Sequence, residues 1–209
     1  MGVDAGLAAA VTLQRQRPGD VCSVADRVTQ FTLAHVLLDG GYDGVVTLGD
    51  ILPSGDQGLG AADKLDGEVV VVDGVPWRVD WHGNASVLPP EARVPFIVLT
   101  TLDSPRTVRL RDASRDDVVA AIADLGGTGD AVVAARLEGS FSDVVVRSVR
   151  GQEPPYRPIA EVLTTDEVRW EHHRFEGVFV GFQFPDLGGG SVIPGIHLHG
   201  LNTDRTTGG

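Results

Sequence analysis

The sequence predicts a β-rich α/β fold in which two sheets pack together with a few short helices. Three observations lead to it. Runs of β-branched residues bounded by turn residues recur along the chain, few segments have a helical pattern, and the last third is nearly all strand. At 209 residues and 42% hydrophobic content, the chain can bury a substantial core. We expect a mixed first sheet and an antiparallel second sheet, packed as two layers.

Three regions are expected along the chain. Residues 1–24 show no clear periodicity, which is typical of a disordered tail. Residues 25–128 form a β-rich α/β domain, and residues 129–209 form an antiparallel β domain. The boundary lies at Gly126-Gly127-Thr128-Gly129. This segment resembles a phosphate-binding loop only superficially, because no Lys-Ser or Lys-Thr opens a following helix.

The first half contains the clearest local signals. A short helix is expected after Thr47, a capping residue with an acid three positions later, and Pro53 closes it. Residues 68–79 predict a hairpin, because two β-branched runs flank Asp73-Gly74, a favoured two-residue turn. Strands are expected at 95–101 and 107–111.

The second half begins with a helix and continues as strands. Ser114 caps a helix expected to run to about Asp124. Pro154-Pro155-Tyr156-Arg157-Pro158 predicts a stiff, extended connector. The strands expected in this half are 131–137, 140–146, 168–175, 178–184 and 196–201.

Charge and composition exclude some classes of function. With 17 basic and 29 acidic residues the formal net charge is −12, which argues against binding nucleic acid or anionic membranes. No apolar segment reaches the ~18 residues of a membrane span. The single cysteine, Cys22, cannot form an internal disulfide, and Arg15 follows rather than precedes the N-terminal apolar run. We therefore expect a cytoplasmic protein without a signal peptide.

His197-Leu198-His199 is the most informative motif. In a strand, residues two apart point to the same face, so the two imidazoles are aimed at one point. Neutral imidazoles are good zinc ligands, although a zinc site needs three or four protein ligands. The alternative is a pair of half-exposed strand residues. His172 and His173 are adjacent, so they point to opposite faces and are expected to be ordinary surface and core-edge positions.

Several short motifs occur together in a specific order. They are Tyr42-Asp43-Gly44, Gly58-Leu59-Gly60, Leu65-Asp66-Gly67-Glu68, Arg147-Ser148-Val149, Pro155-Tyr156-Arg157-Pro158, Glu176-Gly177, Gly181-Phe182, Pro194-Gly195-Ile196-His197-Leu198-His199 and Asn202-Thr203-Asp204-Arg205. In these motifs the chain resembles the α-acetolactate decarboxylase family over roughly residues 28–209. The resemblance implies a two-domain, β-rich lyase, with a homodimer possible. Such enzymes bind one zinc ion and convert acetolactate to acetoin in the butanediol pathway.

The resemblance also implies site residues. His197 and His199 match the first two zinc ligands, and the third would directly follow Gly209. The motif is interrupted there, so we expect the chain to be truncated at that point. Glu68 and Arg147 match the other two active-site positions. Ala61 and Leu65 fall at the substrate pocket, where the family usually has threonine in place of Ala61.

These residue types suit the implied chemistry. Loss of carbon dioxide from acetolactate leaves an electron pair that the neighbouring ketone accepts. Zinc, or another divalent ion, would stabilise the resulting oxyanion charge as a Lewis acid on the ketone and hydroxyl oxygens. Glu68, at the start of a rigid strand, would handle the proton, and the guanidinium fork of Arg147 suits a carboxylate or oxyanion. Taken alone, both residues are more typical of exposed strand ends.

Two other hypotheses stay open. The chain is a catalytically impaired or metal-free binding member of the fold, because two histidines and water would hold zinc weakly. Alternatively it is a decarboxylase of a related 2-hydroxy-3-keto acid, with Ala61 enlarging the pocket.

Overall fold

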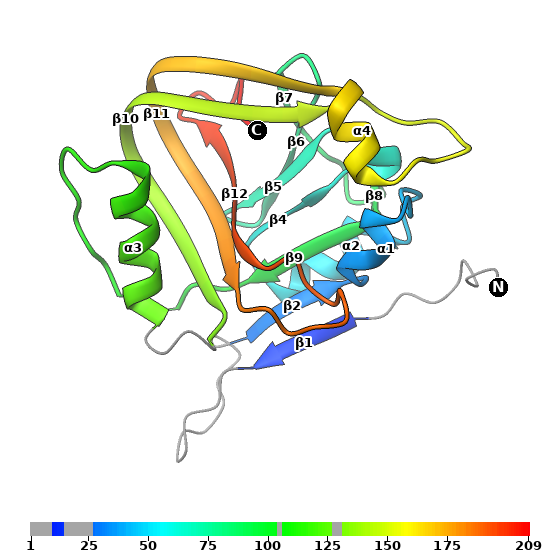
Figure 1. Cartoon of the computed structure of the whole chain (residues 1–209), viewed down its shortest axis with the longest axis horizontal. Coiled ribbons are helices and arrows are strands. Elements are labelled where there is room, and N and C mark those ends of the chain that lie inside the picture. Colours follow the sequence, from blue (N-terminus) through cyan, green and yellow to red (C-terminus); the bar gives the residue numbers. More distant parts are fainter. Residues whose placement is uncertain (1–9, 15–26, 104–105, 127–130) are drawn as a thin grey trace.

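The computed structural model describes residues 10–14, 27–103, 106–126 and 131–209 (Figure 1). Within these ranges the helices are α1 (Ala34–Leu38), α2 (Leu48–Ile51), α3 (Arg115–Gly126) and α4 (Ile159–Thr165), with single 3₁₀ turns η2 (Leu52–Ser54) and η3 (Asp63–Leu65). The strands are β1 (Ala10–Gln14), β2 (Arg27–Phe31), β3 (Val46–Thr47), β4 (Gln57–Ala61), β5 (Glu68–Val72), β6 (Val75–Val79), β7 (Ala85–Val87), β8 (Arg93–Val94), β9 (Phe96–Thr100), β10 (Val133–Val149), β11 (Glu167–Phe184) and β12 (Gly195–Asn202).

The strands form two main sheets and confirm the β-rich architecture with few short helices. One has seven strands in the order β1-β2-β9-β4-β5-β6-β7, and the other has three in the order β10-β11-β12. Strands β3 and β8 pair separately. The prediction of a mixed first sheet is wrong, because all its described pairings are antiparallel. Consecutive strands β4 to β7 are joined by short turns, which produce antiparallel neighbours without a helical crossover.

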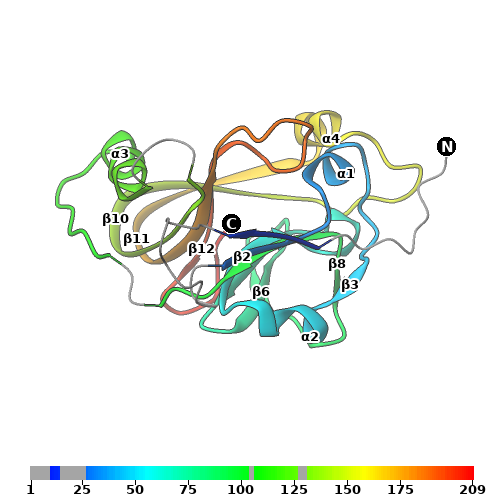
Figure 2. The same cartoon turned by 90° about the horizontal axis from the view of Figure 1, so that it is seen from below.

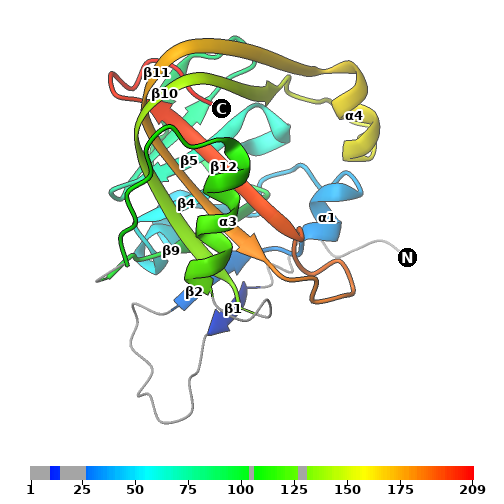
Figure 3. The same ribbon diagram turned by 60° about the vertical axis from the view of Figure 1, so that its left-hand side comes forward.

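The seven-stranded sheet has two different buried faces. Alternate residues such as Val69 and Ile97 face α2, which lies on the side away from the three-stranded sheet (Figure 2). The opposite alternation, which includes Leu59 and Val98, faces Phe182 on β11. The two sheets therefore share a core, and α3 packs on the outside of the three-stranded sheet, against β10 (Figure 3).

Local signals were read correctly at the first hairpin and at both capped helices. Asp73 and Gly74 have φ of 52° and 77°, as a two-residue hairpin turn requires. The Thr47 hydroxyl accepts a hydrogen bond from the Asp50 N–H, and Ser114 does the same for Asp117 at 3.2 Å. The proposed boundary at 126–129 lies outside the described residues except for Gly126.

Three expectations differ from the structure. Residues 10–14, expected within a disordered tail, form β1 because they pair with β2; the rest of 1–24 lies outside the described residues. Residues 107–111 form no strand and are exposed. The strand before them, β9, already pairs with β2 on one side and with β4 on the other, so residues 107–111 have no free edge of β9 to pair with. Four separate strands were expected at 131–137, 140–146, 168–175 and 178–184. The structure has two long strands in their place, β10 and β11.

A polar network ties the two sheets together at the β5–β6 turn. Arg136 of β10 pairs with Asp73 in the turn and also donates to Oε1, the side-chain amide oxygen of Gln57, at 3.1 Å. Hydrogen bonding from Arg136 lowers the pKa of Asp73.

Within the described ranges, no helix has the length and apolar composition needed to cross a membrane.

The Asp73–Arg136 pair predicts a pH-dependent contribution to stability. Because the folded-state pKa of Asp73 is lowered, its contribution is present above the unfolded pKa and is lost as pH falls through the folded pKa. Asp73 is 62% exposed, so solvent screening limits the contribution to at most about 1 kcal/mol. Asp73→Asn should therefore lower the urea midpoint at pH 7 and have little effect at pH 2. Equal effects at the two pH values would contradict this account.

Candidate active site

The six residues expected at the site line one cavity between the two sheets. The cavity lining includes Ala61, Leu65, Glu68, Arg147, His197 and His199. Its volume is about 70 Å³, where a single water needs about 10–15 Å³ on the same scale. The cavity therefore has room for a small molecule.

The histidine pair lies on β12, on the face turned toward the seven-stranded sheet. His197 pairs with Phe182 and His199 with Val180, both of which are buried between the sheets. The two Nε2 atoms are 3.0 Å apart. Two zinc–nitrogen bonds of about 2.0–2.1 Å at a tetrahedral angle would place two nitrogens roughly 3.3 Å apart. The separation fits ligands that converge on one ion.

The protonation of the pair also suits a metal. His199 Nδ1 lies 2.8 Å from the backbone carbonyl oxygen of Val69. Only Nδ1–H can donate to a carbonyl, so the Nε2 lone pair is free to face the cavity. Burial lowers the pKa of His197 and of His199 to about 4, so both rings are neutral at pH 7. Neutral imidazoles are the form that binds zinc.

Glu68 reaches the same point from the other sheet. It begins β5, and its Oε2 is 3.4 Å from His199 Nε2. The turn before it depends on Gly67, whose φ is 99° and where an added Cβ would lie 2.3 Å from the Val79 carbonyl oxygen. Burial raises the pKa of Glu68, and the nearby Glu167 carboxylate acts in the same direction, while His197 and Arg147 oppose it. The carboxyl is therefore biased toward its protonated form.

Arg147 is held by an acid that the sequence did not suggest. Its Nη1 donates to Glu167 Oε2 at 2.6 Å, and Arg169 donates to the other oxygen of the same carboxylate. Burial of Glu167 opposes ionisation, but the hydrogen bonds from Arg169 and Arg147 lower its pKa. Glu167 thus stays ionised and orients the guanidinium of Arg147, a residue that also lines the cavity.

Ala61 and Leu65 shape the wall beside Glu68. Ala61 lies directly opposite Glu68 in the β4–β5 ladder. Leu65 is buried and has φ of 58°, a left-handed conformation in the tight turn that leads to Gly67. A threonine at position 61 would bring a hydroxyl next to the Glu68 carboxylate, and Ala61 leaves that space open.

The other histidines do not line the cavity. His173 is exposed on β11 and its Nδ1 lies 2.6 Å from Asp143, as expected for a surface position. Within the described ranges, no group of three or more His, Cys, Asp or Glu side chains is arranged to hold a metal ion. Cys22 lies outside the described residues.

Sequence reasoning missed three groups at the site. They are Glu167, the Val69 carbonyl oxygen and Gln30, which also lines the cavity. Gln30 had a usable signal, because it occupies the same face of β2 as the buried Val28, where a polar residue is unusual. A backbone carbonyl leaves no mark on the sequence.

Comparisons with known proteins identify the family of the chain. A family model described as alpha-acetolactate decarboxylase matches residues 28–209. The alpha-acetolactate decarboxylase of Methanosarcina mazei is 32% identical over 90% of this chain and 65% of that protein. The enzyme of that name from Methylococcus capsulatus is 34% identical over 87% of this chain and 70% of that protein. The chain thus spans about two thirds of the length of these relatives.

Solved structures give the same result. The alpha-acetolactate decarboxylase from Bacillus subtilis strain 168 superimposes with a TM-score of 0.78 at 32% identity, covering 85% of this chain and 76% of that one. A protein of unknown function from Staphylococcus aureus, described as similar to alpha-acetolactate decarboxylase, gives 0.81 at 27% identity, with the same two coverages.

Proposed function

Because the chain belongs to the α-acetolactate decarboxylase family, we propose that it decarboxylates 2-acetolactate to acetoin with a divalent metal ion, zinc in the first instance, bound at His197 and His199. One observation carries the proposal. Two neutral imidazoles with converging Nε2 atoms, a carboxyl with a raised pKa and an oriented guanidinium line one small cavity.

The ligand set needs a third member, since zinc sites use three or four protein ligands. The register of the last strand segment indicates where it belongs. Gly208 pairs with Leu201, and Gly209 exchanges two backbone hydrogen bonds with Gly200. In this antiparallel register, a residue following Gly209 would lie opposite His199. A histidine at that position, as the resemblance implies, would complete the set. When bound, zinc would act as a Lewis acid on the ketone and hydroxyl oxygens of the substrate.

Arg147 would position the substrate. The substrate carries a carboxylate and develops negative charge on its ketone oxygen, and a guanidinium suits both. Because Glu167 fixes one side of the guanidinium, the remaining N–H groups need no reorganisation when a substrate anion enters.

Glu68 would supply the proton. When the bond to the carboxylate carbon breaks, carbon dioxide leaves and its electron pair passes to the ketone, giving an enediolate. The carbon that lost carbon dioxide must then accept a proton. A protonated Glu68 at one face of the cavity can donate it, which would give one enantiomer of acetoin.

The position of Ala61 favours one alternative substrate. Because Ala61 leaves space opposite Glu68, a 2-hydroxy-3-keto acid with one additional methylene is the second candidate. Such differences change kcat/KM by about 10- to 200-fold, so assays with both substrates separate the candidates.

The proposal is tested by completing the ligand set in a controlled way. Two variants carry one residue appended to Gly209, histidine in one and alanine in the other. The histidine form is expected to bind one zinc per chain at least about 10-fold more tightly and to form acetoin faster. Zinc affinity is measured by competition with a chelator, and acetoin by chiral chromatography. If neither form binds zinc or forms acetoin, the proposed function is wrong.

A further inference from the structure

Arg147 shares its acidic partner with a second arginine, Arg169, which the proposed chemistry does not use. The Glu167 carboxylate accepts a hydrogen bond from Arg147 Nη1 through Oε2, at 2.6 Å, and one from Arg169 Nε through Oε1. The Glu167 side chain is 8% exposed, whereas the Arg169 side chain is 68% exposed. One buried carboxylate therefore lies between a guanidinium at the cavity and a guanidinium at the surface.

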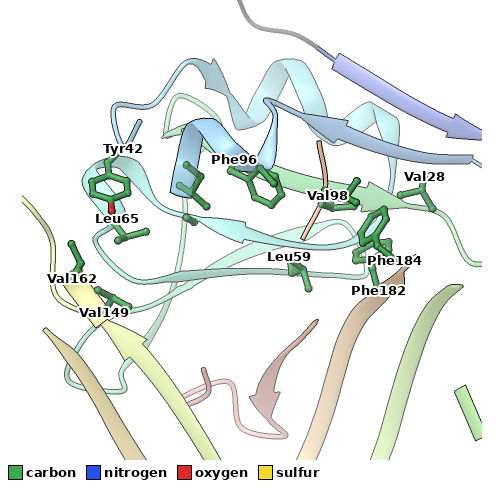
Figure 4. Packing of buried hydrophobic residues seen from close by; sticks show 14 residues of the cluster. Val28, Tyr42, Leu59, Leu65, Phe96, Val98, Val149, Val162, Phe182 and Phe184 are labelled. Atoms are coloured by element: carbon green, nitrogen blue, oxygen red, sulfur yellow. The ribbon is translucent and has the colours of Figure 1, made fainter. Parts of the chain in front are cut away.

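The two arginines lie directly opposite each other in the β10–β11 ladder. Like charges in this arrangement repel each other and destabilise a sheet. Glu167 precedes Arg169 by two residues, so it lies on the same face of β11. Val149, which is opposite Glu167, packs with Leu65 in the core between the sheets and also lines the cavity (Figure 4). This face of the two strands is thus turned toward the cavity, and the acid offsets the repulsion between the arginines.

The charges of the three side chains explain why one acid has two arginine partners. Glu167 and Arg147 alone would form a neutral pair, and both carboxylate oxygens could accept from the same guanidinium fork. Such a pair would attract an anion in the cavity only weakly. Arg169 occupies Oε1, and two positive charges against one negative leave the three groups with a net charge of +1.

The positive charge of Arg147 acts on groups inside the cavity. Burial is the main cause of the lowered pKa of His197 and of His199, and Arg147 acts in the same direction on both. A change in how firmly Glu167 holds Arg147 would therefore change the electrostatic potential at the place where a ligand binds.

We propose that Arg169 is a positioning residue, which shares Glu167 and thereby leaves Arg147 a positive charge for the carboxylate of the substrate. Arg169 does not line the cavity, so it acts only through Glu167. The site would accordingly select a carboxylate over a neutral ligand of the same shape, and Arg169 would set part of that selectivity. The inference rests on the proposed function only for the place of the substrate carboxylate, next to Arg147.

A matched pair of ligands tests the inference by calorimetry at saturating zinc. 2-Hydroxyisobutyrate carries the hydroxyl and the carboxylate of the proposed substrate but has no ketone, so it cannot lose carbon dioxide by the same route. 2-Hydroxyisobutyramide has nearly the same shape and no charge. The quantity measured is the affinity for the anion divided by the affinity for the amide. Arg169→Gln is expected to lower this ratio about three- to ten-fold, and the difference should shrink as salt is added.

Two further variants serve as controls. Arg169→Lys keeps a positive charge beside Glu167 and should retain most of the ratio. Arg115→Gln changes the net charge of the protein by the same amount, but Arg115 is an exposed residue of α3, on the outside of the three-stranded sheet, so the ratio should not change. A purely structural role of Arg169 would lower the melting temperature of Arg169→Gln without changing the ratio.

Three results would overturn the inference and leave the proposed function intact. They are an unchanged ratio in Arg169→Gln, an equal fall of the ratio in Arg115→Gln, and a wild type that binds the anion and the amide equally well. The second result would show that net charge alone is responsible. If neither ligand binds to the wild type with zinc present, the inference and the proposed function both fail.

Discussion

Replacing His199 with alanine is expected to weaken zinc binding by at least about 100-fold, because loss of a partner outside the ligand set already costs about 10- to 100-fold. Acetoin formation should fall by about 10³-fold, since Lewis-acid stabilisation by a metal contributes several kcal/mol and each 1.36 kcal/mol is a factor of ten. Zinc affinity and acetoin formation are measured on the same preparations. Loss of the two properties together would link the histidine pair to both.

His197→Ala tests the same site and keeps the hydrogen bond between His199 and the Val69 carbonyl oxygen. It should show the same loss of zinc affinity and of acetoin formation. The role of the histidine pair can therefore be tested even if the His199 variant fails to fold. His173→Ala is the matched control, because His173 is exposed and pairs only with Asp143 in the described structure. Unchanged zinc affinity in both site variants would show that the pair is not a metal site.

The structure shows which parts of the fold local sequence can determine. The Asp73-Gly74 hairpin and the Ser114 cap were predictable, because each depends on residues within a few positions of one another. The strands expected at 131–137 and 140–146, and at 168–175 and 178–184, leave gaps that contain Gly139 and Gly177, yet these two glycines pair with each other inside the β10–β11 ladder. Whether a glycine ends a strand or only lets it bend depends on the residue opposite it on the neighbouring strand. That residue is distant in sequence.

The same distinction applies to the site. The two-residue spacing of His197 and His199 places them on one face without any knowledge of the fold. The approach of Glu68 to His199 joins two sheets and 131 positions of sequence, so only the family resemblance pointed to it. Glu167 and Gln30 act through partners in the folded chain, Arg147 for the first and the Ser191 carbonyl oxygen for the second. Glu167 belongs to no motif that could have marked it, and Gln30 is marked only as a polar residue on the buried face of β2.

Glu68→Gln is expected to lower acetoin formation by about 10²- to 10⁴-fold, the usual contribution of a positioned acid or base. The glutamine has nearly the same shape but cannot supply the proton. Residual product would then be protonated by water, so its enantiomeric excess should fall as well as the rate. Chiral chromatography of acetoin measures both, and Glu171→Gln, at an exposed position of β11, should change neither.

Stability measurements separate this loss from misfolding. Burial raises the folded-state pKa of Glu68, so the folded state binds more protons than the unfolded state. The free energy of unfolding therefore falls as pH rises from the unfolded-state pKa through the folded-state pKa. Glu68→Gln removes the ionisable group and should be at least as stable as the wild type at pH 7. Active-site groups often lower the stability of the folded protein, so their removal often raises it. Slower turnover with unchanged enantiomeric excess would show instead that Glu68 positions the substrate and that the proton comes from another group. Glu68→Asp, which keeps the acid but withdraws it by one methylene, should retain the enantiomeric preference at a reduced rate.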